Sequence, residues 1–472
     1  MKEDFMINRR TTMASDPHRP QYHFLPPTNW MNDPNGLIQW KGQYHLFYQH
    51  NPTEPLWGNM HWGHAISDDL IHWRDLPIAL APTPGGADET GCFSGCAVVN
   101  DLPTLMYTAT AGANNEIQTQ MIATSADDLL TWDKRPTPVI DQVPSEAGQT
   151  KDFRDPFVWK ENDTWYMVIG SRIQDVGGVI FIYRSPDLLN WEYLNPLLIG
   201  DTKHNGYSWE CPNFIKLGDR WVLIISSHLG TETGTSLYFI GTYENYRFTP
   251  EFEGVFDHSS MYAPLTFTDD QGRRLLVGWL RDPRTDDQKR SAGWSGVQSI
   301  PRILSLDAKH RLNMVVVPEL ESIRGTHHLG DTRAPSDVTT LLLPHARLDV
   351  AATFDPSPGS CGISFAFASD GSEKCEITYE AADHCLTVRN VNANGKLTNS
   401  NREWRIVHAL DDAEPLELRI LLDGSVMEIL ANSRTSLSNR IYPSQVAETL
   451  VQAQNAQALD IWEMPSIWNT DS

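Results

Sequence analysis

The sequence predicts an all-β protein, in which a five-bladed β-propeller is followed by a C-terminal β-sandwich. Three observations support this fold class. A short turn sequence recurs at a constant interval, a second series of sharp segments is interleaved with it, and the whole pattern changes after about residue 322. Within each repeat, Gly, Asn and Asp divide short β-rich runs, which is typical of hairpins.

The first series is an Asp-Leu-x-x-Trp sequence preceded by a nearby serine. Its copies are "DLIHW", "DLLTW" and "DLLNW", which begin at residues 69, 128 and 187 and are therefore 59 residues apart. A degenerate copy, "ENYRF", occupies 244–248. Four short strands with their turns fit an interval of this length, so each interval is interpreted as one blade.

The second series consists of a sharp segment directly before an apolar pair of strands. It occurs five times, at Asp33, Ser94, Asp155, Glu210 and Tyr262. Because this segment comes first in each unit, it should begin the innermost strand, beside the central channel. The sequence therefore predicts that residues from different blades meet at one channel mouth.

The chain is too long for one ordinary core, and its pattern divides it into parts. We expect an N-terminal extension at 1–21, a catalytic propeller at 22–322 and a linker at 323–339. Residues 340–472 contain alternating strands such as "LRILLDGSVMEILAN", which indicate the sandwich.

Composition limits the classes of binding partner and the cellular compartment that we expect for the protein. Lys and Arg number 37 against 60 Asp and Glu, and a net charge of −23 argues against nucleic acid or a membrane as partner. The N-terminus has no apolar core of the signal-peptide kind, and six Cys in 472 residues do not resemble a disulfide scaffold. We expect a cytoplasmic protein without metal or other cofactor. The oligomeric state stays open, a homo-oligomer included.

Asp33, Asp155 and Glu210 are the candidate catalytic residues. Any single acid before Pro or in a turn is better interpreted as a turn-capping residue. Three acids at equivalent positions of different blades would repel one another and would each be desolvated, which is costly unless the cluster has a function. Their placement therefore favours a functional site over three separate turn-capping residues.

Several motifs together resemble one enzyme family. "WMNDPNG", "FYQHNP", "FSG", "RDP" and "WECP", which begin at residues 30, 47, 93, 154 and 209, are similar to the signature blocks of glycoside hydrolase family 32. This is the family of invertases, fructanases and sucrose-6-phosphate hydrolases. The resemblance implies a retaining β-fructofuranosidase that acts on sucrose and short fructo-oligosaccharides.

The resemblance also implies a role for each site residue. Asp33 corresponds to the nucleophile, Asp155 to the transition-state stabiliser and Glu210 to the acid/base. The fructose subsite would be lined by Asn32, Gln49, Trp57, Phe93, Ser94, Arg154 and Trp279.

A retaining mechanism needs an ionised nucleophile and a protonated acid. Turn N–H groups and neighbouring Asn side chains are expected to lower the pKa of Asp33, and the apolar neighbours Trp209 and Pro212 to raise the pKa of Glu210. Arg154 is expected to keep the adjacent Asp155 charged.

Arg154 is also the only cation in the pocket motifs, so we expect sucrose and short fructosides to be preferred over sucrose 6-phosphate. A phosphate would need rim cations, for which the candidates are Lys203, His204, Arg281 and Arg284. Sucrose-6-phosphate hydrolase, fructan exo-hydrolase and fructosyltransferase stay open as alternatives within the family. The alternatives outside the family are an inverting enzyme for arabinose or xylose polymers, a sugar-binding propeller without turnover and a protein scaffold.

Overall fold

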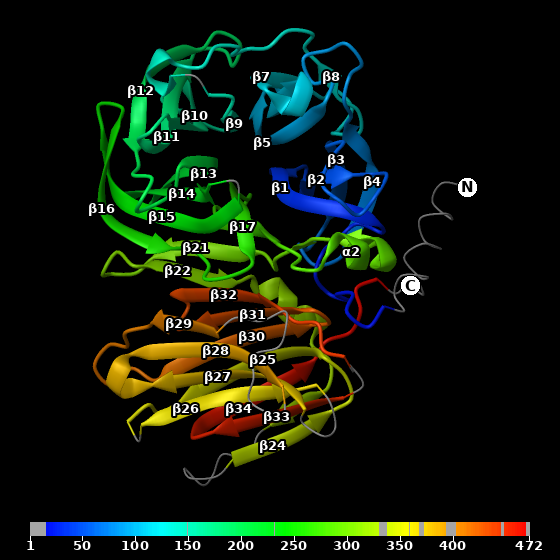
Figure 1. Ribbon diagram of the computed structural model, residues 1–472, viewed down its shortest axis with the longest axis vertical. Coiled ribbons are helices and arrows are strands. Elements are labelled where there is room, and N and C mark those ends of the chain that lie inside the picture. The colour runs from blue at the N-terminus through cyan, green and yellow to red at the C-terminus, as the bar shows by residue number, and fades with distance from the viewer. Residues whose placement is uncertain are drawn as a thin grey trace.

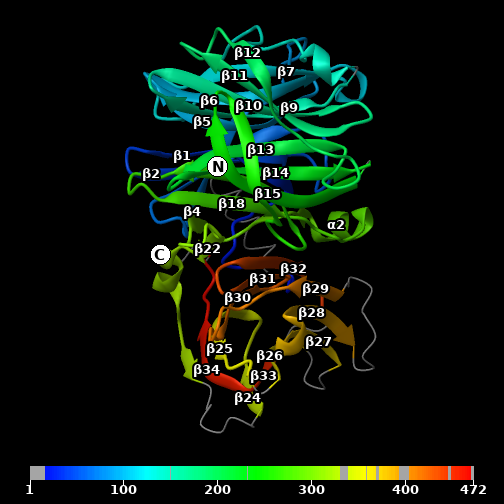
Figure 2. The same ribbon diagram turned by 90° about the vertical axis from the view of Figure 1, so that its left-hand side faces the viewer.

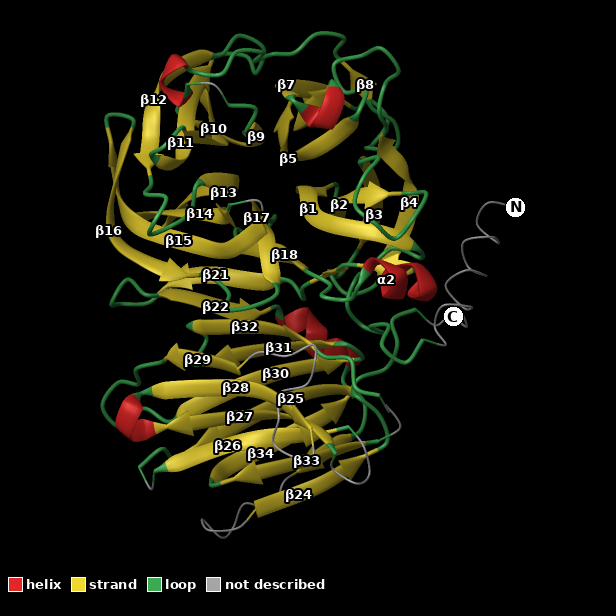
Figure 3. Ribbon diagram, viewed as in Figure 1, coloured by secondary structure: helices red, strands yellow, loops and turns green. Residues whose placement is uncertain are grey.

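The computed structural model describes residues 16–148, 150–230, 232–329, 338–357, 359–367, 372–392, 403–444 and 448–468. Their regular secondary structure is almost entirely β-strand, joined by many loops and turns (Figure 3). Their strands form seven sheets, five in the N-terminal part and two in the C-terminal part. The five N-terminal sheets are arranged in a ring, and the other two pack below them (Figures 1 and 2). This organisation is consistent with a propeller followed by a sandwich.

The first three sheets of the ring follow each other along the chain. The first contains β1 (Asn29–Trp40), β2 (Gln43–Asn51), β3 (His61–Ser67) and β4 (Trp73–Leu80), with β19 (Trp294–Ser295) parallel to β1. The second contains β5 (Gly91–Asn100), β6 (Leu102–Ala111), β7 (Ile117–Thr124) and β8 (Asp133–Lys134). The third contains β9 (Phe153–Glu161), β10 (Thr164–Ile173), β11 (Gly177–Ser185) and β12 (Glu192–Ile199).

The last two sheets complete the ring. The fourth contains β13 (Ser208–Leu217), β14 (Arg220–Leu229), β15 (Glu232–Glu244) and β16 (Arg247–Val255). The fifth contains β17 (Met261–Thr268), β18 (Arg274–Leu280), β20 (Val297–Gln298), β21 (Arg302–Leu306) and β22 (Leu312–Val316). Helix α2 (Asp286–Ala292) interrupts this sheet, and 3₁₀ turns lie at Ala113–Asn115, Ser145–Ala147 and Pro318–Ile323.

The C-terminal part has two six-stranded antiparallel sheets. One contains β23 (His327–Leu329), β34 (Ala456–Glu463), β25 (Arg347–Phe354), β30 (Leu416–Asp423), β31 (Val426–Ala431) and β32 (Thr435–Arg440). The other contains β24 (Val338–Leu343), β33 (Thr449–Gln454), β26 (Ser360–Ala366), β27 (Glu373–Glu380), β28 (Cys385–Asn392) and β29 (Glu403–Val407), with a 3₁₀ turn at Ala381–Asp383. Strands β23 and β24 both begin inside the segment expected as a linker, whose residues 330–337 lie outside the described part.

The recurring Asp-Leu-x-x-Trp turns have a common local structure. Asp69 and Asp187 each accept two backbone N–H groups of the following residues, and in the second sheet Asp127 takes this place beside Asp128. The following leucine, at 70, 129 and 188, is buried and has a positive φ of 66–69°. The aspartate thus stabilises a turn that bends the leucine back into the core, which explains why both residues recur.

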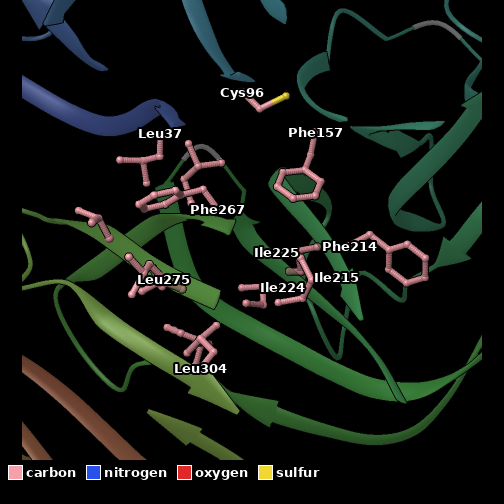
Figure 4. Packing of buried hydrophobic residues seen from close by; sticks show 14 of the residues in the cluster. Leu37, Cys96, Phe157, Phe214, Ile215, Ile224, Ile225, Phe267, Leu275 and Leu304 are labelled. Atoms are coloured by element: carbon pink, nitrogen blue, oxygen red, sulfur yellow. The ribbon is translucent and has the colours of Figure 1, made fainter. Parts of the chain in front are cut away.

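A hydrophobic core closes the centre of the ring. Figure 4 shows Leu37, Phe157 and Phe267, from β1, β9 and β17, projecting into one cluster, with Cys96 of β5 nearby. All four are at most 7% exposed. The sheets are therefore fixed to each other through the apolar halves of their innermost strands, which leaves the beginnings of these strands for polar residues.

Each innermost strand is irregular near its beginning. The pairing register shifts after Asn35, Phe93, Glu210 and Tyr262. In the pairing of β9 with β10 it shifts between Arg154 and Phe157, a stretch that includes Asp155. Such bulges bend a strand and turn side chains away from the regular alternation. Each of the five sheets thus has a β-bulge in its innermost strand, at the position of the second repeated series.

A buried polar network joins the ring to the C-terminal sheets. His23 lies between two carboxylates, with its Nδ1 2.9 Å from Asp423 Oδ2 and its Nε2 2.9 Å from Glu428 Oε1. Glu428 also pairs with Arg302 of β21, and all four side chains are at most 1% exposed. Although burial opposes the charge, hydrogen bonds to both carboxylates raise the pKa of His23 above its ordinary 6.5.

His23 should therefore make stability depend on pH. A raised pKa contributes stability that is complete below about pH 6.5 and is lost as the pH rises through the folded-state pKa. We expect His23→Gln to lower the free energy of unfolding by about 3–5 kcal/mol at pH 6, and by less at pH 9. The melting temperature should fall accordingly. Calorimetry of both proteins across this range measures the difference. His204→Gln, at an exposed histidine, is the control, and an equal loss at both pH values would contradict the charged state of His23.

Candidate active site

The structure brings Asp33, Asp155 and Glu210 together, from β1, β9 and β13. Cys211 lies between them: its Sγ is 3.6 Å from Asp33 Oδ2 and 3.4 Å from Asp155 Oδ2, and its backbone N–H donates to Asp155 Oδ2 at 2.9 Å. Asp155 and Cys211 have φ values of +65° and +48°, so the bulges place both residues in the left-handed region. Three acids from three sheets thus share one pocket.

Asp33 is held by its predicted neighbours. Ser94 Oγ donates to Asp33 Oδ2 at 2.6 Å, and Asn32 Nδ2 donates to Asp33 Oδ1 at 3.0 Å. Asn32 is itself fixed, because its Oδ1 accepts from the Trp30 indole and its backbone oxygen from Gln298. These bonds orient the Asp33 carboxylate but leave it no cationic partner.

Glu210 instead has four donors. Arg154 donates from Nε at 2.8 Å and from Nη2 at 2.6 Å to Oε1. Tyr262 Oη lies 2.7 Å and His228 Nε2 lies 2.6 Å from Oε2. Arg154 is fixed from behind by Asp152, at 2.7 Å. The only cation of the pocket motifs therefore pairs with Glu210.

These contacts reverse the expected split of pKa values. Burial, and then the charge of Asp155, raise the pKa of Asp33 to about 7, although Ser94 and Asn32 oppose the shift. Burial also acts on Glu210, but the charge of Arg154 and the bond from His228 outweigh it and hold the pKa of Glu210 well below its ordinary value. The prediction of a low pKa for Asp33 and a high one for Glu210 was thus wrong for the unliganded site. It considered neighbours along the chain, whereas the deciding cation comes from another sheet.

Asp155 is also held in its charged form less strongly than expected. Burial and the charge of Glu210 raise its pKa to about 6, and the nearby Arg154 only limits this shift. Because the three acids interact, their titrations belong to the cluster and not to single residues. Near pH 6–7 the cluster therefore holds a proton that is available for chemistry.

The predicted aromatic residues form one wall of the pocket. Trp30, Trp279 and Tyr262 are buried side by side, with ring centroids 5.7 Å apart for the first two and 6.3 Å for the last two. Phe93 packs against this cluster and faces Trp57, whose side chain is 54% exposed. The cluster adjoins the acids, because Cys211 packs against it and Tyr262 donates to Glu210. Such apolar rings suit the carbon face of a sugar ring.

Gln49 and the predicted rim cations are placed differently. Gln49 is buried and its amide donates to the Cys92 backbone oxygen rather than to one of the three acids. Arg281 donates to the backbone oxygens of Ser259 and Gly234. Arg284 pairs with Asp282 at 2.6 Å, and His204 lies 3.4 Å from Glu253. These three cations are thus engaged with protein groups, whereas the predicted Lys203 is exposed.

Sequence reasoning missed two site residues, His228 and the hydroxyl function of Tyr262. Tyr262 had marked the fifth unit only as a repeat position, and His228 follows two serines near the end of β14 with no motif around it. Only the pairing of Glu210 with Ser226 and of Ser208 with His228 brings this histidine to the acid. A register prediction for β13 and β14 would have been the signal.

Other titratable groups offer no second centre. No group of three or more metal-binding side chains occurs in the described ranges. His64 of "HWGH" bonds to His45, and His61 to a backbone oxygen. All six cysteines lie among the described residues and are free thiols. No helix in the part of the chain that the structure describes is long and apolar enough to cross a membrane.

Comparisons with known proteins identify the family of this chain. The family model "Glycosyl hydrolases family 32 N-terminal domain" matches residues 23–318, and "Glycosyl hydrolases family 32 C terminal" matches 319–466. The chain therefore belongs to glycosyl hydrolase family 32.

Individual relatives extend this comparison. The chain is 33% identical to a sucrose-6-phosphate hydrolase of Zymomonas mobilis, over 94% of this chain and 90% of the relative. It is 32% identical to the raffinose invertase of Escherichia coli, over 90% and 89%. The structure resembles that of a Bombyx mori β-fructofuranosidase in complex with sucrose, with a TM-score of 0.81, 28% identity and coverage of 98% and 97%.

Proposed function

We propose that this glycoside hydrolase is a retaining β-fructofuranosidase built on a five-bladed propeller. It removes the terminal β-D-fructofuranosyl residue of sucrose and short fructo-oligosaccharides. The observation that carries the proposal is the meeting of Asp33, Asp155 and Glu210 around Cys211, beside a buried aromatic cluster. The names of the relatives, which include an invertase and a β-fructofuranosidase, support the same activity.

The proposed reaction uses the three acids in different ways. Asp33 attacks the anomeric carbon and forms a fructosyl ester, while Glu210 gives a proton to the leaving oxygen. Water then takes the place of the leaving group, gives its proton to Glu210 and releases fructose. Asp155 accepts hydrogen bonds from sugar hydroxyls and holds the ring where positive charge develops.

The pKa order of the unliganded site must be exchanged before this reaction. Asp33 has to be ionised and Glu210 protonated, whereas their surroundings raise the pKa of both aspartates and lower the pKa of Glu210. Arg154 controls this exchange, because its guanidinium favours the anion of Glu210. A sugar that draws Arg154 into hydrogen bonds would weaken this contact and raise the pKa of Glu210.

The stereochemistry tests this proposal. Two displacements at one carbon retain its configuration, so β-D-fructofuranose should be the first product of sucrose cleavage. Proton and carbon NMR spectra recorded before mutarotation can identify it. If α-fructofuranose appears first, the enzyme inverts and Asp33 is not a covalent nucleophile. If no fructoside in a panel is cleaved, a sugar-binding protein without turnover becomes the better interpretation.

Substrate choice is a separate prediction. Because Arg281, Arg284 and His204 are engaged with protein groups, we expect a higher kcat/KM for sucrose than for sucrose 6-phosphate. Parallel kinetics on one enzyme preparation give the ratio. A tenfold advantage of the phosphorylated sugar, about 1.4 kcal/mol of transition-state binding, would reverse this conclusion. The relative named sucrose-6-phosphate hydrolase makes that outcome the second candidate function.

A further inference from the structure

His228 is placed against the carboxyl group that the proposed reaction must protonate. It lies on β14, and its Nε2 is 2.6 Å from Glu210 Oε2. Its side chain is 16% exposed, so this contact is largely shielded from water. At such a separation one proton must lie between the two atoms, either on the imidazole or on the carboxyl group.

The surroundings allow either location. Tyr262 Oη is 2.7 Å from Glu210 Oε2 and 3.0 Å from the backbone oxygen of Ser227. The hydroxyl of Tyr262 can donate its single proton either to the Glu210 carboxylate or to the Ser227 backbone oxygen. When it donates to Ser227, its oxygen can accept a hydrogen bond from a protonated Glu210. The site can thus accommodate both an imidazolium beside a carboxylate and a neutral histidine beside a carboxylic acid.

Charged groups from three sheets surround this pair. Arg154 of β9 reaches it through Glu210 Oε1, and the carboxyl groups of Asp155 and Asp33 are close enough to interact with the charge of Glu210. The ring of Tyr207, before β13, packs edge-on against His228 at 6.1 Å. Arg281, directly after β18, lies 5.1 Å over the ring of Tyr262. Histidine is the side chain whose charge changes near neutral pH, which suits it to supply a proton here.

We propose that Glu210 and His228 act as one proton-holding pair, in which the imidazolium is the store and Glu210 delivers the proton. His228 is then a positioning residue that acts through Glu210. The inference rests on the proposed function, because it assumes that Glu210 is the acid/base.

The proton balance of the pair is closed. In the first step the Nε2–H bond breaks, Glu210 passes a proton to the leaving oxygen, the glycosidic C–O bond breaks and an Asp33–carbon bond forms. In the second step water forms the new C–O bond, the ester to Asp33 breaks, and the proton of water returns through Glu210 to Nε2. No oxidant, reductant or further reactant is needed.

His228→Gln tests the pair. Glutamine can still donate a neutral hydrogen bond to Glu210 but cannot store a proton. We expect kcat/KM for sucrose to fall ~10- to 100-fold, and the alkaline limb of its pH profile to move. With β-D-fructofuranosyl fluoride, whose leaving group needs little protonation, the loss should stay within about threefold. In the wild type, ¹⁵N NMR shifts of the His228 ring should change across the same pH range as the alkaline limb.

Two controls separate the outcomes. His204→Gln makes the same substitution at an exposed rim histidine and should leave both substrates and the pH profile unchanged. If His228→Gln lowers kcat/KM equally for both substrates and the alkaline limb of the pH profile does not move, His228 has only a structural role and the proposed pair is refuted. If the wild type cleaves neither sucrose nor the fluoride, the proposed function itself has failed.

Discussion

Asp33→Asn should abolish nearly all turnover, with kcat/KM for sucrose at least ~1,000-fold below the wild type. An amide cannot form the fructosyl ester, so the first displacement has no nucleophile. Asparagine has nearly the same shape, and Ser94 and Asn32 stay in place to bond to it. Initial rates at high enzyme concentration measure the residual activity, and more than about a hundredth of the wild-type rate would contradict the nucleophile assignment.

The same variant should not lose stability. The raised pKa of Asp33 means that its ionised form is disfavoured in the folded protein, at a cost that grows from pH ~4 to ~7 and is then constant. Removal of the charge should therefore keep or raise the melting temperature at pH 7.5. A marked decrease would show that Asp33 supports the fold, and the activity loss could then reflect unfolding.

Asp282→Asn is a matched control, because Asp282 also precedes a proline in "RDP". Its carboxylate is buried against Arg284, at 2.6 Å, and accepts from the Tyr442 hydroxyl at 2.9 Å. The charge of Arg440, and then the bonds from Arg284, overcome burial and lower the pKa of Asp282 to about 2. We expect this variant to lose stability but to keep its activity per folded molecule, which is the opposite of Asp33→Asn.

The contrast between these two aspartates shows what a repeat can and cannot predict. The regular spacing of Asp33, Asp155 and Glu210 predicted their convergence, because equivalent strands in a ring begin at the same centre. Asp282 lacks that register, and it forms an ion pair elsewhere. Register thus also distinguished the identical tripeptides at 154–156 and 281–283, which local chemistry could not.

The electrostatics of the site were beyond the sequence for a physical reason. Arg154 adjoins Asp155 in the chain, but successive residues of a strand point to opposite faces, and the bulge turns them further apart. Its guanidinium therefore reaches Glu210, one sheet away, and the pKa order follows that contact. His228 was missed for a similar reason, since its approach to Glu210 depends on the pairing of β13 with β14.

Glu210→Gln should have the second largest effect, with kcat/KM for sucrose ~100- to 10,000-fold lower. The amide cannot protonate the glucosyl oxygen, although its own oxygen can still accept from Arg154. The fluoride substrate should form the fructosyl ester at close to the wild-type rate, because fluoride leaves with little help from an acid. Breakdown of the ester would then limit turnover, since no base activates water.

Added azide should reveal this blocked step. Azide is an anion and needs no general base, so it should attack the ester on Asp33 and restore turnover of the fluoride by Glu210→Gln. The product should be β-fructofuranosyl azide, because two displacements retain the configuration. Product NMR and rates with and without azide give the result. Glu253→Gln, at a rim glutamate paired with His204, should show no dependence on azide. If kcat/KM falls equally for sucrose and the fluoride, and azide does not restore turnover, Glu210 is not the acid/base. Only a group that exchanges protons with both the leaving oxygen and water predicts the substrate difference and the rescue together.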